Sequence, residues 1–467
     1  MVHFIAVLGA AITVASAQAP AGKASIPFAE ARPIFQVLQP QLWPADLRTT
    51  TLAAIEAGWP KWIAREDAAI RARVQAGDED SIINLLLYGT SFTRRPRISE
   101  TELAGVVVRQ RETGATTFVP SPVLTLRIDD FMAAVALPGT NERMQFARQV
   151  LARSGMDASS ATGKVRLRTY LEDRAAVVGG AVHASTLLDP NARLVDQVTI
   201  FHDRGLASDT SILIDFGIDT ALGEAKAAGV LNPALVRRVA VIGPGLDFTD
   251  KQEGHDFYPQ QTIQPFAVIE SLKARGLAAP AGVQVTAFDL SSRVIQHIDA
   301  ARARARDGRS YTLVLPRELE RPWTADLARY WQRFGDRIGQ QTRVVAPPPE
   351  AGRLDVRAVA IPPPVVLSIA SRDLNVIVQR MEPLPPEQQF DLVLATNILL
   401  YYDVFEQSLA VANIAKMMRP GGIFLTNDRM FELPASPVRL VGATNVVYLD
   451  QPGTSIKGDR IAWYQRP

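Results

Sequence analysis

The sequence contains no cysteine, and this absence excludes several kinds of site at once. Without thiols the chain cannot form disulfides, hold an iron–sulfur cluster, bind zinc through sulfur or use a cysteine nucleophile. Histidine is also scarce, and the few histidines lie far apart with no HExxH or HxH pair, which argues against a histidine-built metal site. The five histidines are His3, His183, His202, His255 and His297.

The chain also lacks a large excess of positive or of negative charge. Lys and Arg total 50 and Asp and Glu total 48, which leaves a formal net charge of +2. A near-neutral chain lacks the overall attraction that strongly basic nucleic-acid binders use, so we expect no nucleic-acid partner. No stretch reaches 18 uninterrupted apolar residues, so we also expect no transmembrane helix. With 467 residues, 47% of them hydrophobic, the chain is globular in composition.

The N-terminus carries a short apolar run, FIAVLGAAITV over residues 4–14, followed by Ala15-Ser16-Ala17. This run is too short to span a bilayer, and its A-x-A ending is typical of a secretory signal peptide. We therefore predict a signal peptide over residues 1–17 and export to the periplasm or beyond, although Met1-Val2-His3 lacks the usual Lys or Arg. The alternative is a cytoplasmic protein in which the run is a buried strand or helix.

Residues 24–200 are predicted to form a mainly helical N-terminal domain. Asp46 is a candidate N-cap for its first long helix, and Pro60 is expected to break that helix in two. An acidic run at 78–80 is expected to begin a further segment. No motif in this half carries chemistry. The remaining expected elements are helices over 141–154 and 168–187 and a single strand over 123–128.

Residues 201–467 have a different pattern, in which short β-branched runs alternate with helical segments. Such alternation predicts βαβ units and a parallel sheet. The expected fold is α/β, with a Rossmann-like, doubly wound, mostly parallel sheet and an antiparallel C-terminal edge. An insertion at about 308–368 is predicted to hold a helix over 317–338 and stiff proline triplets at 347–349 and 362–364. The expected strands are 238–242, 283–288, 390–395, 423–426, 445–449 and 460–465, and the expected helices are 265–275, 292–306 and 407–418.

Two of the predicted strands end in residues suited to a nucleotide-like ligand. The run VAVIGPGLDF places Gly243 and Gly245 directly after a strand, where a backbone without side chains lets a ligand approach. Asp289 ends the next strand, and a carboxylate there can accept both hydroxyl hydrogens of a ribose. The alternatives are a simple turn and an Asp favoured by a helix dipole.

A third motif completes the pattern. FDLVLATNILLYYD, residues 390–403, is followed by RPGGIFLTND, residues 419–428. Together with the glycine turn and Asp289, these elements resemble class I S-adenosylmethionine-dependent methyltransferases. Within that superfamily they are most similar to the chemotaxis-receptor methyltransferase branch. The resemblance covers about residues 237–428.

The resemblance implies roles for individual residues. The two glycines would line the methionine and ribose portion of the cofactor, Asp289 would bind the ribose, Leu290 and the turn at 379–381 would contact the adenine, and Asn397 would lie beside the transferred methyl group. Two features depart from the family: Val241 stands where an acid is common, and Asp247 where a third glycine is common. No acidic pair follows the glycine turn, so a receptor-glutamate substrate is not supported. The implied cofactor-binding residues are Gly243, Gly245, Asp247, Asp289, Leu290, Arg380, Met381 and Asn397.

The polar loop at 246–264 and the tyrosines after the third strand are candidates for substrate contact. The loop contains His255 and Tyr258, and it is predicted either to close over the pocket with a base such as His255 or to be a solvated surface loop. Tyr401 is predicted either to contact substrate or to pack under the following helix. No catalytic residue is assigned.

The function expected from these residues is S-adenosylmethionine-dependent methyl transfer to an unknown small-molecule or protein acceptor. Transfer from a sulfonium requires mainly alignment, so the lack of a metal site or catalytic triad fits an enzyme of this kind. One alternative is an exported, non-catalytic binding protein on the same fold, because this cofactor is made in the cytosol. Another is a related aminopropyl- or nucleotide-dependent transferase.

Overall fold

The computed structural model describes residues 22–99, 120–157, 160–186, 205–247, 256–318, 323–347, 355–428, 430, 433–434, 436–449 and 457–467. The predicted signal peptide at 1–17 and His255 lie outside the described residues. Within the described ranges, no helix is both long and apolar enough to cross a membrane.

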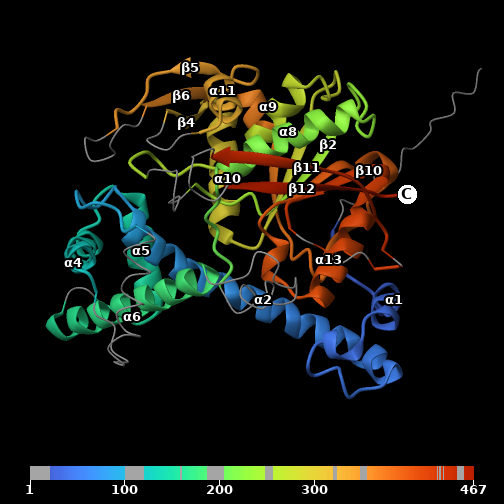
Figure 1. Cartoon of the computed structure of the whole chain (residues 1–467), viewed down its shortest axis with the longest axis horizontal. Helices are drawn as coiled ribbons and strands as arrows, with labels where there is room; N and C mark the ends of the chain where they lie inside the picture. Colours follow the sequence, from blue (N-terminus) through green and yellow to red (C-terminus); the bar gives the residue numbers. More distant parts are fainter. Residues whose placement is uncertain are drawn as a thin grey trace, which may run out of the picture.

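A seven-stranded sheet forms the centre of the C-terminal half (Figure 1). Its strand order is β11-β12-β10-β9-β2-β3-β7. The strands from β10 to β7 pair in parallel, whereas β12 is antiparallel to both β10 and β11. The predicted parallel sheet with an antiparallel C-terminal edge is therefore confirmed. The strands are β2 (Arg238–Ile242), β3 (Gln284–Asp289), β7 (Ile369–Asp373), β9 (Phe390–Ala395), β10 (Met418–Thr426), β11 (Arg439–Leu449) and β12 (Lys457–Gln465).

Both faces of this sheet are buried. Alternate side chains of a strand point to opposite faces, and in β2 Val239 and Val241 belong to one hydrophobic core while Ala240 and Ile242 belong to another. Helices α8, α9 and α10 supply the first core, and α1, α13 and the first half of α2 supply the second. This arrangement makes the sheet doubly wound. The helices are α1 (Phe28–Val37), α2 (Leu52–Tyr88), α8 (Leu213–Ala227), α9 (Gln264–Ala274), α10 (Ser292–Arg306) and α13 (Val404–Met417).

A helical group lies at one end of α2, away from α1 (Figure 1). Its members pack around the last turns of α2 in a third core that contains Ile82, Leu86 and Phe131. The predicted mainly helical character of the N-terminal region is confirmed. The group consists of α4 (Pro122–Ala136), α5 (Glu142–Arg153) and α6 (Ala161–Thr186). A two-stranded sheet joins β1 (Gly22–Ser25) to β8 (Gln379–Glu382).

The predicted break at Pro60 was wrong. Helix α2 continues through Pro60 and through the acidic run at 78–80, and its N-cap is Thr51 rather than Asp46. Trp59 and Trp62 lie before and after Pro60 in the sequence. Both are buried, and their rings stack on each other. Their packing outweighs the roughly 3 kcal/mol that a proline costs inside a helix.

The strand predicted over 123–128 was also wrong, because these residues belong to α4. Ser121 caps this helix by accepting the backbone N–H of Leu124, and Pro122 occupies the first turn, where a missing N–H is not needed. The buried residues follow helical spacing, which a window of six residues does not reveal. They are Leu124, Arg127, Ile128, Phe131 and Val135.

The insertion is a small antiparallel sheet rather than a long helix. Its strand order is β4-β6-β5, and α11 packs against it. The helix predicted over 317–338 is therefore confined to α11, and two of the prolines at 362–364 begin α12 instead of an extended segment. Pro348 and Pro349 lie outside the described residues. The elements are β4 (Tyr311–Glu318), α11 (Ala325–Arg333), β5 (Gln340–Thr342), β6 (Asp355–Ile361) and α12 (Pro363–Leu367).

Candidate functional site

The glycine turn follows β2 at the carboxyl edge of the parallel sheet. Gly243 and Gly245 have φ angles of +65° and +63°, which side-chain-bearing residues rarely adopt. The N–H of Gly243 donates to the carbonyl of Phe288 at 2.7 Å, which ties the turn to the end of β3. A Cβ on Gly243 would lie 2.2 Å from Cδ1 of Ile398. Glycine is therefore required at position 243 both by its φ angle and by the close packing of Ile398.

Asp289 is the last residue of β3 and lies beside the glycine turn. Its Oδ1 accepts the backbone N–H of Ser291 at 2.8 Å, and its carboxylate also accepts the backbone N–H groups of Gly245 and Leu290. Burial raises the pKa of Asp289 to about 6, because desolvation outweighs these donors and the charge of Arg293. The carboxylate is thus ionised at neutral pH and held in a fixed orientation by backbone groups.

A cavity of about 850 Å³ opens at the carboxyl ends of β2, β3, β7 and β9. This volume includes the part of the cavity that is open to solvent. The chain leaves β2 toward β3 on one side and returns to β9 on the other, so the cavity lies at the topological switch point where such sheets bind ligands. Six of the predicted site residues line it: Gly243, Gly245, Asp289, Leu290, Asn397 and Tyr401.

The turn after β9 forms the rim of this cavity. Asn397 has a φ of +58°, and its backbone N–H and side-chain oxygen pair with the side-chain amide of Asn427, both at 2.8 Å. The N–H groups of Ile398 and Leu399 donate to the Asp428 carboxylate at 3.1 and 2.8 Å. Burial raises the pKa of Asp428 to about 6. The end of β10 therefore holds the turn at the end of β9 in place.

Asn427 and Asp428 end the RPGGIFLTND motif, and no role was predicted for them from the sequence. Their position directly after a buried strand is the signal that could have identified them. Three residues that line the cavity after β7 were also missed, namely Leu374, Asn375 and Val376. Asn375 is anchored by a bond from its side-chain nitrogen to Asp67 of α2 at 2.8 Å. The run Leu-Asn-Val contains no glycine turn and no carboxylate, so it carries no local signal of a ligand site.

Asp247 and Tyr258 lie away from the cavity lining. Asp247 is 1% exposed, and it accepts bonds from the Tyr258 hydroxyl at 2.7 Å and from the Gln261 amide at 2.9 Å. Arg143 of α5 donates to the Asp247 carbonyl at 3.2 Å. These contacts fasten the segment after the glycine turn to the helical group.

Arg380 and Met381 also lie away from the cavity. Both belong to β8, where Arg380 pairs with Glu30 at 2.8 Å and with Glu382 at 2.9 Å. Met381 is paired with Lys23 in the small sheet. The strand that brings residues to the cavity at this edge is β7, six residues earlier in the chain.

The helical half supplies one wall of the cavity. Val74 of α2 and the segment 206–211 lie among the lining residues. The N–H of Leu206 donates to the Arg73 carbonyl at 2.9 Å, and Leu246 and Ser208 share a further backbone bond at 2.8 Å. The cavity is therefore enclosed jointly by the sheet edge, by α2 and by the segment between them.

The lining contains few groups that could act as acids or bases. Among its described residues the titratable ones are Asp209, Asp289, Tyr401 and Tyr402, and burial raises the pKa of Tyr402 above its usual range. No group of three or more potential metal ligands occurs within the described part of the chain. His297, outside the cavity lining, is bonded to the Tyr311 hydroxyl at 2.8 Å. The arrangement is suited to binding and aligning a ligand.

No protein-family model and no curated protein matches the chain. Among solved structures it is similar to the glycopeptide N-methyltransferase MtfA complexed with sinefungin, with 10% identity and a TM-score of 0.20, over 52% of this chain and 66% of that one. The mitomycin 7-O-methyltransferase MmcR has 13% identity and a TM-score of 0.24, over 89% and 100% of the two chains. DesVI of Streptomyces venezuelae has 9% identity and a TM-score of 0.21, over 54% and 77%. At these scores the similarity assigns no activity.

Proposed function

We propose that the protein is an S-adenosylmethionine-dependent methyltransferase. The observation that supports this most directly is the convergence of a glycine turn and a strand-end carboxylate in one cavity at the switch point of the sheet. A nucleoside with a charged arm is the ligand class that such a crevice accommodates.

The residues present fit this cofactor. The ionised Asp289 can accept at least one ribose hydroxyl hydrogen, because a carboxylate offers about four acceptor positions and its backbone donors number three. Leu290, Leu374 and Val376 provide apolar surface for a base on the β7 side of the cavity. Gly243 and Gly245 have positive φ angles, and the turn that they form borders the cavity.

When bound, the sulfonium of this cofactor supplies an electrophilic methyl group. The chain's own residues bind and align: the carboxylate holds the ribose, the glycine turn holds the arm, and Val74 with the segment 206–211 excludes water from one side. The Asn397–Asn427 pair fixes the rim where an acceptor would enter. We assign no catalytic base.

Titration calorimetry with S-adenosylmethionine and S-adenosylhomocysteine tests this proposal on the purified full chain. Asp289→Asn should weaken the affinity about tenfold or more, the scale of hydrogen bonds lost from a charged group. Asp373→Asn is the matched control, because Asp373 pairs with Asp289 in register at the end of the neighbouring strand and is not among the cavity residues. The affinity of Asp373→Asn for both ligands should stay within about twofold of that of the parent protein. Absence of binding at millimolar ligand would refute the proposal.

Within the methyltransferase superfamily, the FDLVLATN and RPGG motifs favour the chemotaxis-receptor branch as the nearest relatives. The leader-like residues 1–17 favour a second candidate, an exported binding protein on the same fold. N-terminal sequencing of the native protein separates the two. A mature start at Gln18 together with no cofactor binding would support the exported binding protein, and an intact Met1 with cofactor binding would support the enzyme.

A further inference from the structure

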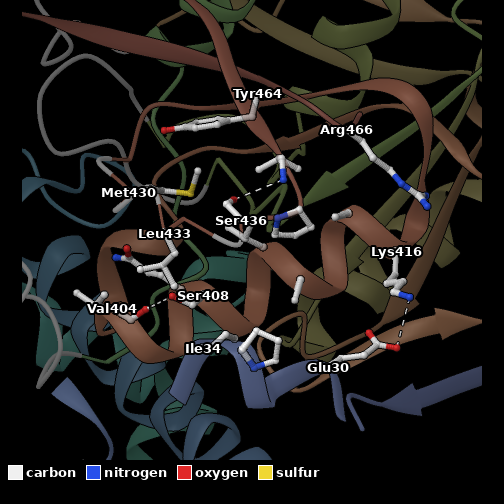
Figure 2. Close-up of a pocket in the computed structure, with 17 residues that line it drawn as sticks. Glu30, Ile34, Val404, Ser408, Lys416, Met430, Leu433, Ser436, Tyr464 and Arg466 are labelled. Carbon is white, nitrogen blue, oxygen red and sulfur yellow. Dashed lines mark hydrogen bonds and ion pairs between the residues drawn. The ribbon is translucent and has the colours of Figure 1, made fainter. Parts of the chain in front are cut away.

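A second cavity runs along the outer face of α13 (Figure 2). It encloses about 1,070 Å³, including the part open to solvent. Its walls come from α1, from α13, from described residues after β10 and from the end of β12. It shares no lining residue with the first cavity. We refer to it as the α13 groove.

The floor of the α13 groove is an apolar stripe on α13. Val404, Ser408, Val411, Ala412 and Ala415 recur at helical spacing and face the groove. From the first to the last of them the helix rises about 16 Å. The stripe therefore suits an elongated ligand. Opposite it lie Pro33, Ile34, Met430, Leu433, Val438 and Tyr464.

The walls offer little to a polar chain. The Ser408 hydroxyl is engaged with the Val404 carbonyl at 2.6 Å, and Ile34, Val411 and Tyr464 are 7%, 8% and 5% exposed. A peptide lying in the groove would bring backbone N–H and C=O groups that Ile34 and Val411 cannot pair. An alkyl chain has no such requirement.

Cations are found at one end of the groove. Figure 2 shows Lys416 and Arg466 together at the end opposite Val404, with Glu30 near Lys416. Arg466 donates to the Met418 carbonyl, and no carboxylate of the described residues forms an ion pair with it. This end of the groove can therefore receive an anionic head group.

Glu30 is shared between two cations, Arg380 and Lys416. Its two oxygens are held by Arg380 at 2.8 and 3.2 Å, whereas Lys416 lies 3.5 Å from it. Glu382 is bound to Arg380 as well, at 2.9 Å. Among the described residues, Arg466 is therefore the cation at this end of the groove that has no carboxylate partner.

Gln407 stands between the groove and the first cavity. Its side-chain nitrogen donates to the carbonyls of Leu399 and Tyr402 at 2.9 and 3.0 Å, and Tyr402 lines the first cavity. A ligand in the α13 groove is thus separated from the cofactor cavity by this side chain.

We propose that the α13 groove binds a long-chain monocarboxylate. The alkyl chain lies along the apolar stripe of α13, and the carboxylate lies at the end that carries Lys416 and Arg466. The inference does not depend on the proposed methyltransferase function, because none of the groove residues belongs to the cofactor cavity.

Calorimetry of the full chain with saturated carboxylates of eight to sixteen carbons, kept below micelle-forming concentrations, tests the proposal. Each added methylene should lower Kd about fourfold, the equivalent of ~0.8 kcal/mol, until the groove is filled. Alkyl ammonium ions and alcohols of equal length should bind at least tenfold more weakly. Equal affinity for ammonium and carboxylate, or binding only to vesicles of anionic phospholipid, would overturn it.

Two pairs of variants locate the site. Arg466→Gln should weaken carboxylate binding about tenfold, while Arg309→Gln, whose exposed guanidinium pairs with nearby Asp307, should not change it. Ala412→Trp fills the groove and should abolish binding, while Ala303→Trp at an exposed position of α10 should preserve it. All four should retain the parent's circular dichroism. Unchanged binding by Ala412→Trp, or a dimer in solution that buries the groove, would contradict the assignment.

Discussion

At the scale of single residues, Asp289 joins the parts of the cofactor cavity. It accepts N–H groups from its own turn and from Gly245, so the carboxylate links the ends of β2 and β3. Its pKa of about 6 lies well above the ordinary 3.8, because burial penalises the charged form more than the N–H donors favour it. Additional hydroxyl donors from a ribose would stabilise the ionised form, and ligand binding would therefore lower this pKa.

This coupling predicts a pH dependence of cofactor affinity. The hydroxyl donors require the ionised carboxylate, so below pH 6 binding must first remove a proton from Asp289. We expect the Kd of S-adenosylhomocysteine to be constant above about pH 7 and to rise toward tenfold per pH unit below 6. Calorimetry from pH 7.5 to 5 measures the slope. Asp289→Asn should bind more weakly with a flat profile, and a flat profile in the parent protein would contradict the ribose role.

Residues at strand ends were predictable because a local pattern marks them. Gly243, Asp289 and Asn397 each follow a β-rich run, and parallel strands bring their carboxyl ends to one edge. The turn after β7 was not predictable in this way. Whether residues 374–376 or 379–381 reach the cavity depends on which strand joins the main sheet, and that choice is made by pairing with β3 and β1 far away in the sequence.

At the scale of elements, α13 begins at a capping box that faces a third carboxylate. Asp403 and Glu406 exchange bonds with each other's backbone N–H at 2.8 and 2.7 Å. Glu66 of α2 forms a side-chain hydrogen bond with Glu406, and its pKa is raised to about 7 by burial and then by the charge of Glu406. Two acidic helix segments are thus packed together and share a proton near neutral pH.

Replacing Glu66 should therefore stabilise the protein in a pH-dependent way. The folded pKa of about 7 exceeds the ordinary 4.5, so stability falls as the pH rises between these values. Glu66→Gln removes the repulsion and keeps a hydrogen-bond donor. We expect it to raise the free energy of unfolding by about 1 kcal/mol at pH 8, allowing for partial exposure, and by little at pH 4. Thermal unfolding at both values measures this.

Glu56→Gln on the same helix is the control for that comparison. Glu56 is exposed and pairs only with Arg32 among the described contacts. Losing this ion pair should lower the free energy of unfolding by less than about 1 kcal/mol, and Glu56→Gln should not raise it at pH 8. Equal effects of the two substitutions at pH 8 would show that the Glu66–Glu406 contact does not raise the pKa.

The type of an element was predictable where its hydrophobic pattern was long. The prediction was wrong where tertiary packing determined the structure. β2, β9 and α10 have the predicted bounds to within a residue, because each is a strongly patterned run with clear ends. Pro60 predicted a break, yet burial of Trp59 and Trp62 keeps α2 continuous. Sequence-local preferences do not include such distant contacts.

At the scale of the whole molecule, α2 connects three regions. Its 37 residues extend about 55 Å. Trp59 packs in the core beneath the sheet, Val74 lines the cofactor cavity, and Leu86 lies in the core of the helical group. The helical half contributes a wall of the cavity rather than reactive groups, which is why its sequence carries no chemical motif. That contribution depends on a close crossing of two backbones, which no pattern of hydrophobic or charged residues records.

The crossing of α2 by the segment 205–211 gives the last prediction. A Cβ on Gly77 would lie 2.0 Å from the Leu206 carbonyl oxygen, whereas a Cβ on Gly58 of the same helix would meet nothing within 4 Å. Alanine is favoured over glycine in helices by up to about 1 kcal/mol, so Gly58→Ala should stabilise the protein slightly. Gly77→Ala should instead destabilise it by about 1–3 kcal/mol, the scale of overpacking, because the obstructing atoms are backbone. The displaced segment forms a wall of the cavity, so the affinity for S-adenosylhomocysteine should fall about tenfold in Gly77→Ala and stay unchanged in Gly58→Ala. Chemical unfolding and calorimetry on both variants measure the two effects. Equal stability and equal affinity of the two variants would show that this crossing does not shape the cavity.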